Sequence, residues 1–177
     1  MSHTVRWTLE KIAQRLALIE PLVYRRRAEM LNFRYFSPPL ADTRQPTALD
    51  PGEGMEILPN TYWGTPSSEF TLRTTFQIPA DWDAGQPIAL YLPLGDAGNF
   101  SHPEALVVVD GLAYAACDRH HQEVLLRPQW ADGRPHELVL QGWTGLGDDW
   151  NTSTVTRTIM RRCAVVQIDQ TTRELVA

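Results

Sequence analysis

The sequence has few cysteines, no long apolar run and no leader pattern. Cys117 and Cys163 are the two cysteines among 177 residues, and they form no Cys-x-x-Cys pair. We expect both thiols to be reduced and buried. The longest apolar runs, residues 105–109 and 112–117, fall far short of the roughly 18 residues that a membrane-spanning helix needs. The N-terminus lacks the basic and then apolar pattern of a secretory signal. These absences predict a cytoplasmic protein.

Several catalytic motifs are also missing. The chain has no Gly-x-Ser-x-Gly elbow, no phosphate-binding glycine loop and no Gly-x-Gly-x-x-Gly after a strand. Five histidines occur, but none has the His-Glu-x-x-His spacing of a zinc helix. We therefore expect neither nucleophilic nor nucleotide chemistry, and no metal or cofactor bound by this chain.

Charge is unevenly distributed along the chain. The net charge is −5, but residues 1–34 carry +4, residues 35–156 carry −11 and residues 157–177 carry +2. The run Arg25 to Arg27 is too short, and too poor in stacking aromatics, for a nucleic-acid surface, and the acidic body would repel phosphate. We expect these arginines to be solvated or to contact an acidic partner surface, with neither nucleic acid nor membrane as a partner.

The first 36 residues are expected to form a helix and a lead-in. Apolar side chains recur at steps of three and four residues from Val5 to Ile19, which is typical of an amphipathic helix, and Pro21 ends the pattern. Such a stripe predicts that the helix packs on another surface. Residues 37–60 are rich in proline, glycine and aspartate, and are expected to form an extended connector.

After residue 60 the apolar period becomes two. Residues 70–78 alternate between apolar and polar side chains, and Asp110-Gly111 separates two apolar runs as in a two-residue hairpin. Further short strands are expected at 88–92, 123–126 and 137–141 and within 155–168. Their number and spacing predict a mainly β fold, an antiparallel β-sandwich over residues 61–168 with an exit segment at 169–177, in one structural domain overall.

Six residues are candidates for sugar or interdomain contacts. An exposed indole can stack on a sugar ring, whereas a buried one belongs to the core, and burial is the commoner state of such residues. Adjacent histidines on a strand point in opposite directions and are poor metal co-ligands. The adjacent carboxylates at 148 and 149 are more typical of a turn than of a catalytic pair. The candidates are Trp63, His120, His121, Trp130, Trp143 and Asp148.

A series of sequence blocks over most of residues 8–145 resembles one known family. The blocks are Ile12/Arg15/Leu16/Ile19, Pro21-Leu-Val-Tyr24, Trp63-Gly64, Phe70-Thr-Leu-Arg73, Ile78-Pro79-Ala-Asp-Trp82, Ala105-Leu-Val-Val-Val-Asp-Gly111, Asp118-Arg-His-His121-Gln-Glu-Val124 and His136-Glu-Leu-Val-Leu-Gln-Gly-Trp-Thr-Gly145. Their order and spacing resemble the N-terminal domain of glycoside hydrolase family 38 α-mannosidases of the cytosolic/vacuolar type. His120 stands where the family pattern has Asn.

The resemblance implies a jelly-roll or galactose-binding-like sandwich that precedes a separate catalytic barrel. It implies that zinc or another divalent metal, and the nucleophilic aspartate, belong to that barrel, so that this chain alone is inactive. The implied partners are the catalytic domain of the same polypeptide, a second copy of the chain and a mannose-containing oligosaccharide.

Two other functions stay open at this point. One is a stand-alone carbohydrate-binding module that uses exposed tryptophans. The other is a small glycosidase with paired carboxylates, because sequence does not report the separation of carboxyl groups.

Overall fold

The structure is a computed structural model that describes residues 8–36, 54–64, 67–95, 102–145 and 158–177. The helical elements are α1 (Thr8–Ile19), the 3-10 turns η1 (Glu20–Val23) and η2 (Pro128–Trp130), and α2 (Gln170–Val176). The strands are β1 (Tyr24–Glu29), β2 (Phe33–Phe36), β3 (Met55–Ile57), β4 (Thr61–Trp63), β5 (Glu69–Gln77), β6 (Ile88–Tyr91), β7 (Glu104–Val109), β8 (Leu112–Cys117), β9 (Glu123–Leu125), β10 (Pro135–Trp143), β11 (Thr158–Met160) and β12 (Ala164–Ile168).

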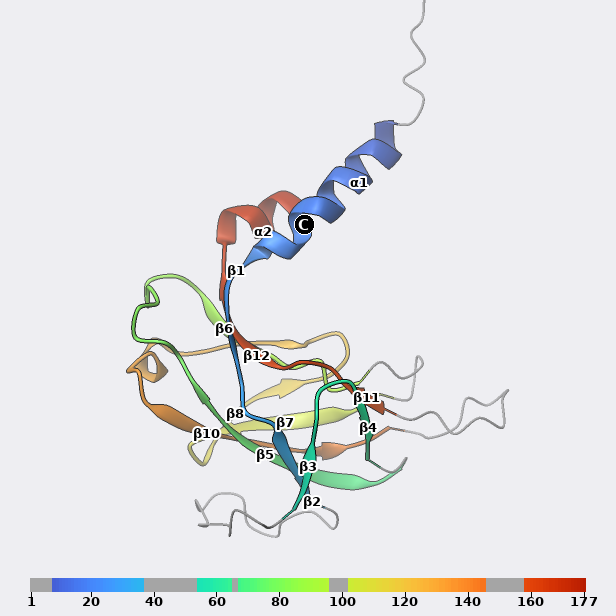
Figure 1. The fold of residues 1–177 in the computed structure, drawn as a ribbon, viewed down its shortest axis with the longest axis vertical. Helices are drawn as coiled ribbons and strands as arrows, with labels where there is room; N and C mark the ends of the chain where they lie inside the picture. Colours follow the sequence, from blue (N-terminus) through green and yellow to red (C-terminus); the bar gives the residue numbers. More distant parts are fainter. Residues whose placement is uncertain (1–7, 37–53, 65–66, 96–101, 146–157) are drawn as a thin grey trace, which may run out of the picture.

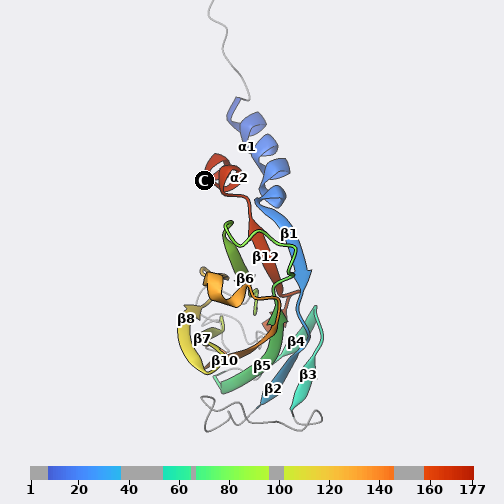
Figure 2. The same cartoon turned by 90° about the vertical axis from the view of Figure 1, so that its left-hand side faces the viewer.

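Two antiparallel sheets form the body of the molecule. A six-stranded sheet has the order β3-β2-β5-β10-β7-β8, a four-stranded sheet has the order β1-β12-β6-β9, and β11 pairs with β4. Figures 1 and 2 show the two larger sheets as layers, with α1 and α2 together at one end. The predicted mainly β sandwich with a leading helix is confirmed.

The strands follow from the period-two pattern of the sequence. In β5, Phe70, Leu72 and Phe76 are buried, and the strand pairs along its whole length with β10. Asp110 and Gly111 have φ angles of 50° and 77°, as the predicted two-residue hairpin between β7 and β8 requires. Aspartate and glycine tolerate this left-handed region better than branched residues do.

The two central strands of the four-stranded sheet, β6 and β12, are buried on both faces. The inner face of the sheet contributes Leu90 and Val165 to the main core, where they lie among side chains of the six-stranded sheet. Its outer face carries a smaller cluster that includes Ala89, Val166 and Ile168, and Tyr24, Tyr91 and Val176 pack against that cluster. All five residues of β12 are therefore buried, which explains its nearly continuous apolar run.

The sandwich begins earlier in the chain than the predicted boundary at residue 61. Within the predicted lead-in, β1 joins the four-stranded sheet and β2 joins the six-stranded sheet. Within the predicted connector, residues 37–53 lie outside the described ranges, but β3 pairs with β2. The connector prediction rested on proline and glycine content, which does not report pairing with strands distant in sequence.

The arginine run lies on a strand and makes contacts within the chain. Arg25, Arg26 and Arg27 are the second to fourth residues of β1. Arg26 bonds to Asp81 at 3.1 Å, Arg25 lies 3.6 Å from Asp169, and Arg27 donates to the Arg162 carbonyl at 2.7 Å. These arginines are thus engaged within the chain.

Helix α1 extends away from the sandwich instead of packing on it. None of its residues is buried, and Leu9, Ile12 and Leu18 are 80%, 49% and 77% exposed. Figure 2 shows the helix projecting beyond the sheets. The predicted helix is confirmed from residue 8 onward, but the described part of the chain leaves its apolar side chains largely uncovered. In that same part, no helix has both the length and the apolarity that crossing a bilayer demands.

Both cysteines are buried and unpaired, as expected. Burial raises the pKa of each thiol to about 12. The thiols are therefore protonated at neutral pH and behave as small core side chains.

Candidate functional site

We define the helical end of the molecule as η1, α1 and α2, of which η1 and α2 pack on the outer face of the four-stranded sheet. Helix α2 contacts both η1 and α1. Val23 of η1 is buried in the outer-face cluster, and Val176 of α2 packs against the same cluster. Asp169 begins α2 by accepting a hydrogen bond from the Thr172 backbone N–H at 2.8 Å.

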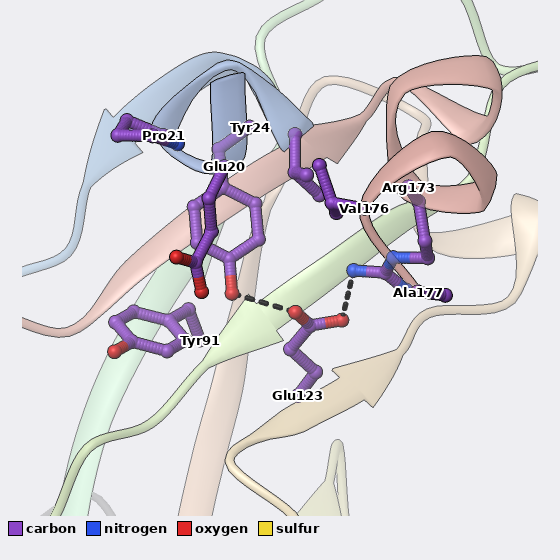
Figure 3. A pocket seen from close by; sticks show the side chains of 9 residues that line it. Glu20, Pro21, Tyr24, Tyr91, Glu123, Arg173, Val176 and Ala177 are labelled. Carbon is purple, nitrogen blue, oxygen red and sulfur yellow. Dashed lines mark hydrogen bonds and ion pairs between the residues drawn. The ribbon is translucent and has the colours of Figure 1, made fainter. Parts of the chain in front are cut away.

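A pocket of about 450 Å³ lies where the helical end meets the sheet (Figure 3). This volume is within the range of small-molecule sites. Strands and helices distant in sequence build its walls. The lining residues are Glu20, Pro21, Val23, Tyr24, Tyr91, Glu123, Arg173, Val176 and Ala177.

Glu123 is the centre of the polar network in the pocket. The Tyr24 hydroxyl donates to Oε1 at 2.6 Å, and Arg173 donates to Oε2 at 2.5 Å. Figure 3 shows these two donors approaching the carboxylate from different sides. Each carboxylate oxygen keeps further lone-pair capacity, and the guanidinium keeps further N–H groups. The network is therefore fixed in place and can still bind hydroxyl groups.

Tyr24 and Tyr91 form an aromatic wall beside this network. Their ring centroids are 5.3 Å apart, with a tilt of 50° between the ring planes. Burial and the hydrogen bond to Glu123 raise the pKa of the Tyr24 hydroxyl well above its usual range. Tyr24 is thus a neutral hydrogen-bond donor at physiological pH.

Two of the three tryptophans named from the sequence are buried in the core. Trp63 is 3% exposed and donates its Nε1–H to the Leu94 carbonyl at 2.7 Å. Trp130 is 4% exposed and contacts Tyr114 edge to face. Trp143 is half-buried at the end of β10. A stacking role for Trp63 and Trp130 is therefore wrong, because both indoles fill the core.

Of the remaining candidates, His120 and His121 lie within the described residues. His120 and His121 are exposed, and their backbone N–H groups donate to Asp118 Oδ1 at 2.6 and 2.8 Å. Burial raises the pKa of Asp118, but hydrogen bonds from the His121 side chain and from both backbone groups outweigh it. The pKa of this carboxyl is therefore lowered. Asp148 lies outside the described residues. Within the described ranges, no three His, Cys, Asp or Glu side chains are arranged to hold a metal ion.

Sequence reasoning missed the residues that line the pocket. Tyr24, Tyr91, Glu123 and Arg173 share no local spacing that predicts a common site. Tyr91 and Glu123 become neighbours because they are partners where β6 pairs with β9. Arg173 belongs to α2 and donates to Glu123 from that helix. The one available signal was the alternation of Ile88-Ala-Leu-Tyr91, which places Ala89 and Tyr91 on the face opposite Ile88 and Leu90.

Comparison with known proteins gives a limited result. No family model matches the chain, and no curated protein matches it. It is similar to two solved structures of a β-glucuronidase from Ruminococcus gnavus, in complex with C6-substituted uronic isofagomine and with uronic deoxynojirimycin. The TM-scores are 0.49 and 0.41, the identities are 12% and 13%, and each match covers 82% of this chain and 29% of the other. The chain thus spans less than a third of those proteins, and overlaps of this size assign it no function.

Proposed function

We propose that this chain is a non-catalytic accessory domain of a glycoside hydrolase, an α-mannosidase that hydrolyses α-mannosidic bonds in oligosaccharides. The ordered sequence blocks over residues 8–145 support the α-mannosidase assignment. In this proposal the divalent metal and the nucleophile belong to a catalytic domain of the same polypeptide. The proposal includes a cytosolic location, which two buried and unpaired cysteines support.

The observation that carries the accessory role is the uncovered apolar side of α1. Leu9 and Ile12, three residues apart on the apolar stripe, are 80% and 49% exposed on a helix that also carries Lys11 and Arg15. Apolar side chains at helical spacing are typically covered by a second surface. We assign that surface to the catalytic domain, and expect it to be apolar with an acidic rim that complements the basic side chains of α1.

The first test compares the 177-residue chain with the product of the open reading frame that contains it. We expect turnover of an aryl α-mannoside by the longer product, loss of that turnover with a chelator, and none by the 177-residue chain. Turnover by the short chain contradicts the non-catalytic assignment. A frame that encodes no His-x-Asp metal motif, with no turnover by its product, contradicts the α-mannosidase assignment.

The second test addresses docking in the longer product. Replacing both Leu9 and Ile12 by Ser should uncouple the domains, so that one calorimetric unfolding transition separates into two. The matched control replaces Leu112 and Leu125, which are 46% and 55% exposed on the sandwich. Separation in the control alone, or in neither variant, rules out docking through α1.

A further inference from the structure

The pocket between the helical end and the four-stranded sheet combines an apolar wall with fixed polar groups. Pro21, Val23 and Val176 line it together with the rings of Tyr24 and Tyr91. Glu20, Glu123 and Arg173 supply charged groups from three different elements. A few fixed polar groups on an otherwise apolar lining are typical of a site for a small organic ligand.

The polar groups are held in position before any ligand arrives. Glu123 is bonded on both carboxylate oxygens, to Tyr24 at 2.6 Å and to Arg173 at 2.5 Å. Glu123 and Arg173 keep 29% and 32% of their side-chain surface exposed, so both reach solvent at the pocket. A ligand therefore meets an ordered acceptor and an ordered donor, which lowers the entropic cost of binding.

The charge balance of the pocket selects against anions. Its lining carries two carboxylates, Glu20 and Glu123, and one guanidinium, Arg173, so an anion meets net repulsion. Because Glu123 and Arg173 already compensate each other's charge, a neutral ligand that both donates and accepts hydrogen bonds can bind them without separating the pair.

We propose that this pocket binds one neutral pyranose unit. The apolar face of a pyranose ring suits the tyrosine wall, while adjacent hydroxyl groups can donate to Glu123 and accept from Arg173. The pocket is a sugar site distinct from the tryptophans. Its physiological role, holding an oligosaccharide near a catalytic domain, rests on the proposed function, whereas sugar binding by this chain does not.

The experiment titrates ¹⁵N-labelled 177-residue chain with methyl α-mannoside, methyl β-glucoside and methyl β-glucuronide, followed by amide chemical shifts. Saturable shifts should centre on residues 24, 91, 123 and 173, and the glucuronide should bind more weakly than both neutral sugars. Tyr91→Ala and Arg173→Met should each weaken binding about tenfold. Arg173→Met is the variant less prone to unfold the chain, because α2 lies at the surface.

The matched control is Tyr62→Ala, which removes a 60% exposed tyrosine of β4 outside the pocket. Its affinity for the neutral sugars should equal that of the parent chain. Absence of saturable shifts with both neutral sugars overturns the proposal, as does binding that survives Arg173→Met unchanged or that favours the glucuronide. None of these failures bears on the proposed function, which is tested by turnover and by unfolding of the longer product.

Discussion

The sandwich and the helical end of this chain bury their apolar side chains very differently. In the sandwich, Leu72, Leu140 and Val107 are fully buried between two sheets. At the helical end, α1 buries no residue, and Tyr24, Tyr91 and Val176 are only partly buried around the outer-face cluster. Closed packing leaves little surface for a ligand, so the functional hypotheses concern the helical end.

The largest contrast should appear on truncating one leucine in each region. Leu140→Ala removes a side chain with no exposure, and should lower the free energy of unfolding by about 2–5 kcal/mol. Leu18→Ala removes a side chain that is 77% exposed, and should change the free energy of unfolding by less than about 0.5 kcal/mol. Urea unfolding of both variants measures this. Comparable losses would mean that α1 packs on the sandwich in solution.

A smaller effect should distinguish α2 from the sheets in the rate of amide exchange. Asp169→Ala removes the side chain that accepts from the Thr172 N–H, and should speed amide exchange in α2 roughly fivefold, the factor expected for loss of an N-cap. Asp169→Asn keeps an acceptor and serves as the control. Amides of β5 and β10 should exchange at unchanged rates in both variants. Equal acceleration in those strands would show that α2 and the sandwich unfold as one unit.

The smallest effect is the loss of stability at acidic pH. The Arg134 backbone N–H and side chain donate to Asp132 and lower the pKa of its carboxyl to about 2. Because this folded-state pKa lies below the unfolded value of about 3.9, the stabilisation is complete above about pH 5 and is lost as pH falls through the folded-state pKa. Asp169 has a lowered pKa because Thr172 donates to it, so α2 should fray over the acidic range as well.

Carboxyl ¹³C chemical shifts measured against pH report the protonation of Asp132 and of Asp169. Arg134→Met should move the midpoint of Asp132 toward its ordinary value and leave that of Asp169 unchanged. Movement of both midpoints would contradict independent behaviour of the two regions.

Much of the β-sandwich could be predicted because its strands are locally patterned. The alternation in β5 and the Asp110-Gly111 turn each report their conformation through neighbouring residues. By contrast, β1 carries three consecutive arginines and still pairs with β12. Its strand state depends on a partner more than 130 residues away, and no local pattern reports that.

The candidate site was beyond sequence reasoning for the same reason. Trp63 and Trp130 were named for their chemistry, but burial decided their role. Tyr24, Glu123 and Arg173 are unremarkable in the sequence, and they form a network only because β1, β9 and α2 meet.

The sequence by itself determined the mainly β class, the leading amphipathic helix, the hairpin and the buried thiols, because periodicity, turn chemistry and composition act over a few residues. Only the tertiary structure decided that α1 projects uncovered, that β6 and β12 are buried on both faces, and that a pocket forms over the outer face of their sheet. Those features depend on which distant segments become neighbours, and the free energy that selects such neighbours is summed over the whole chain.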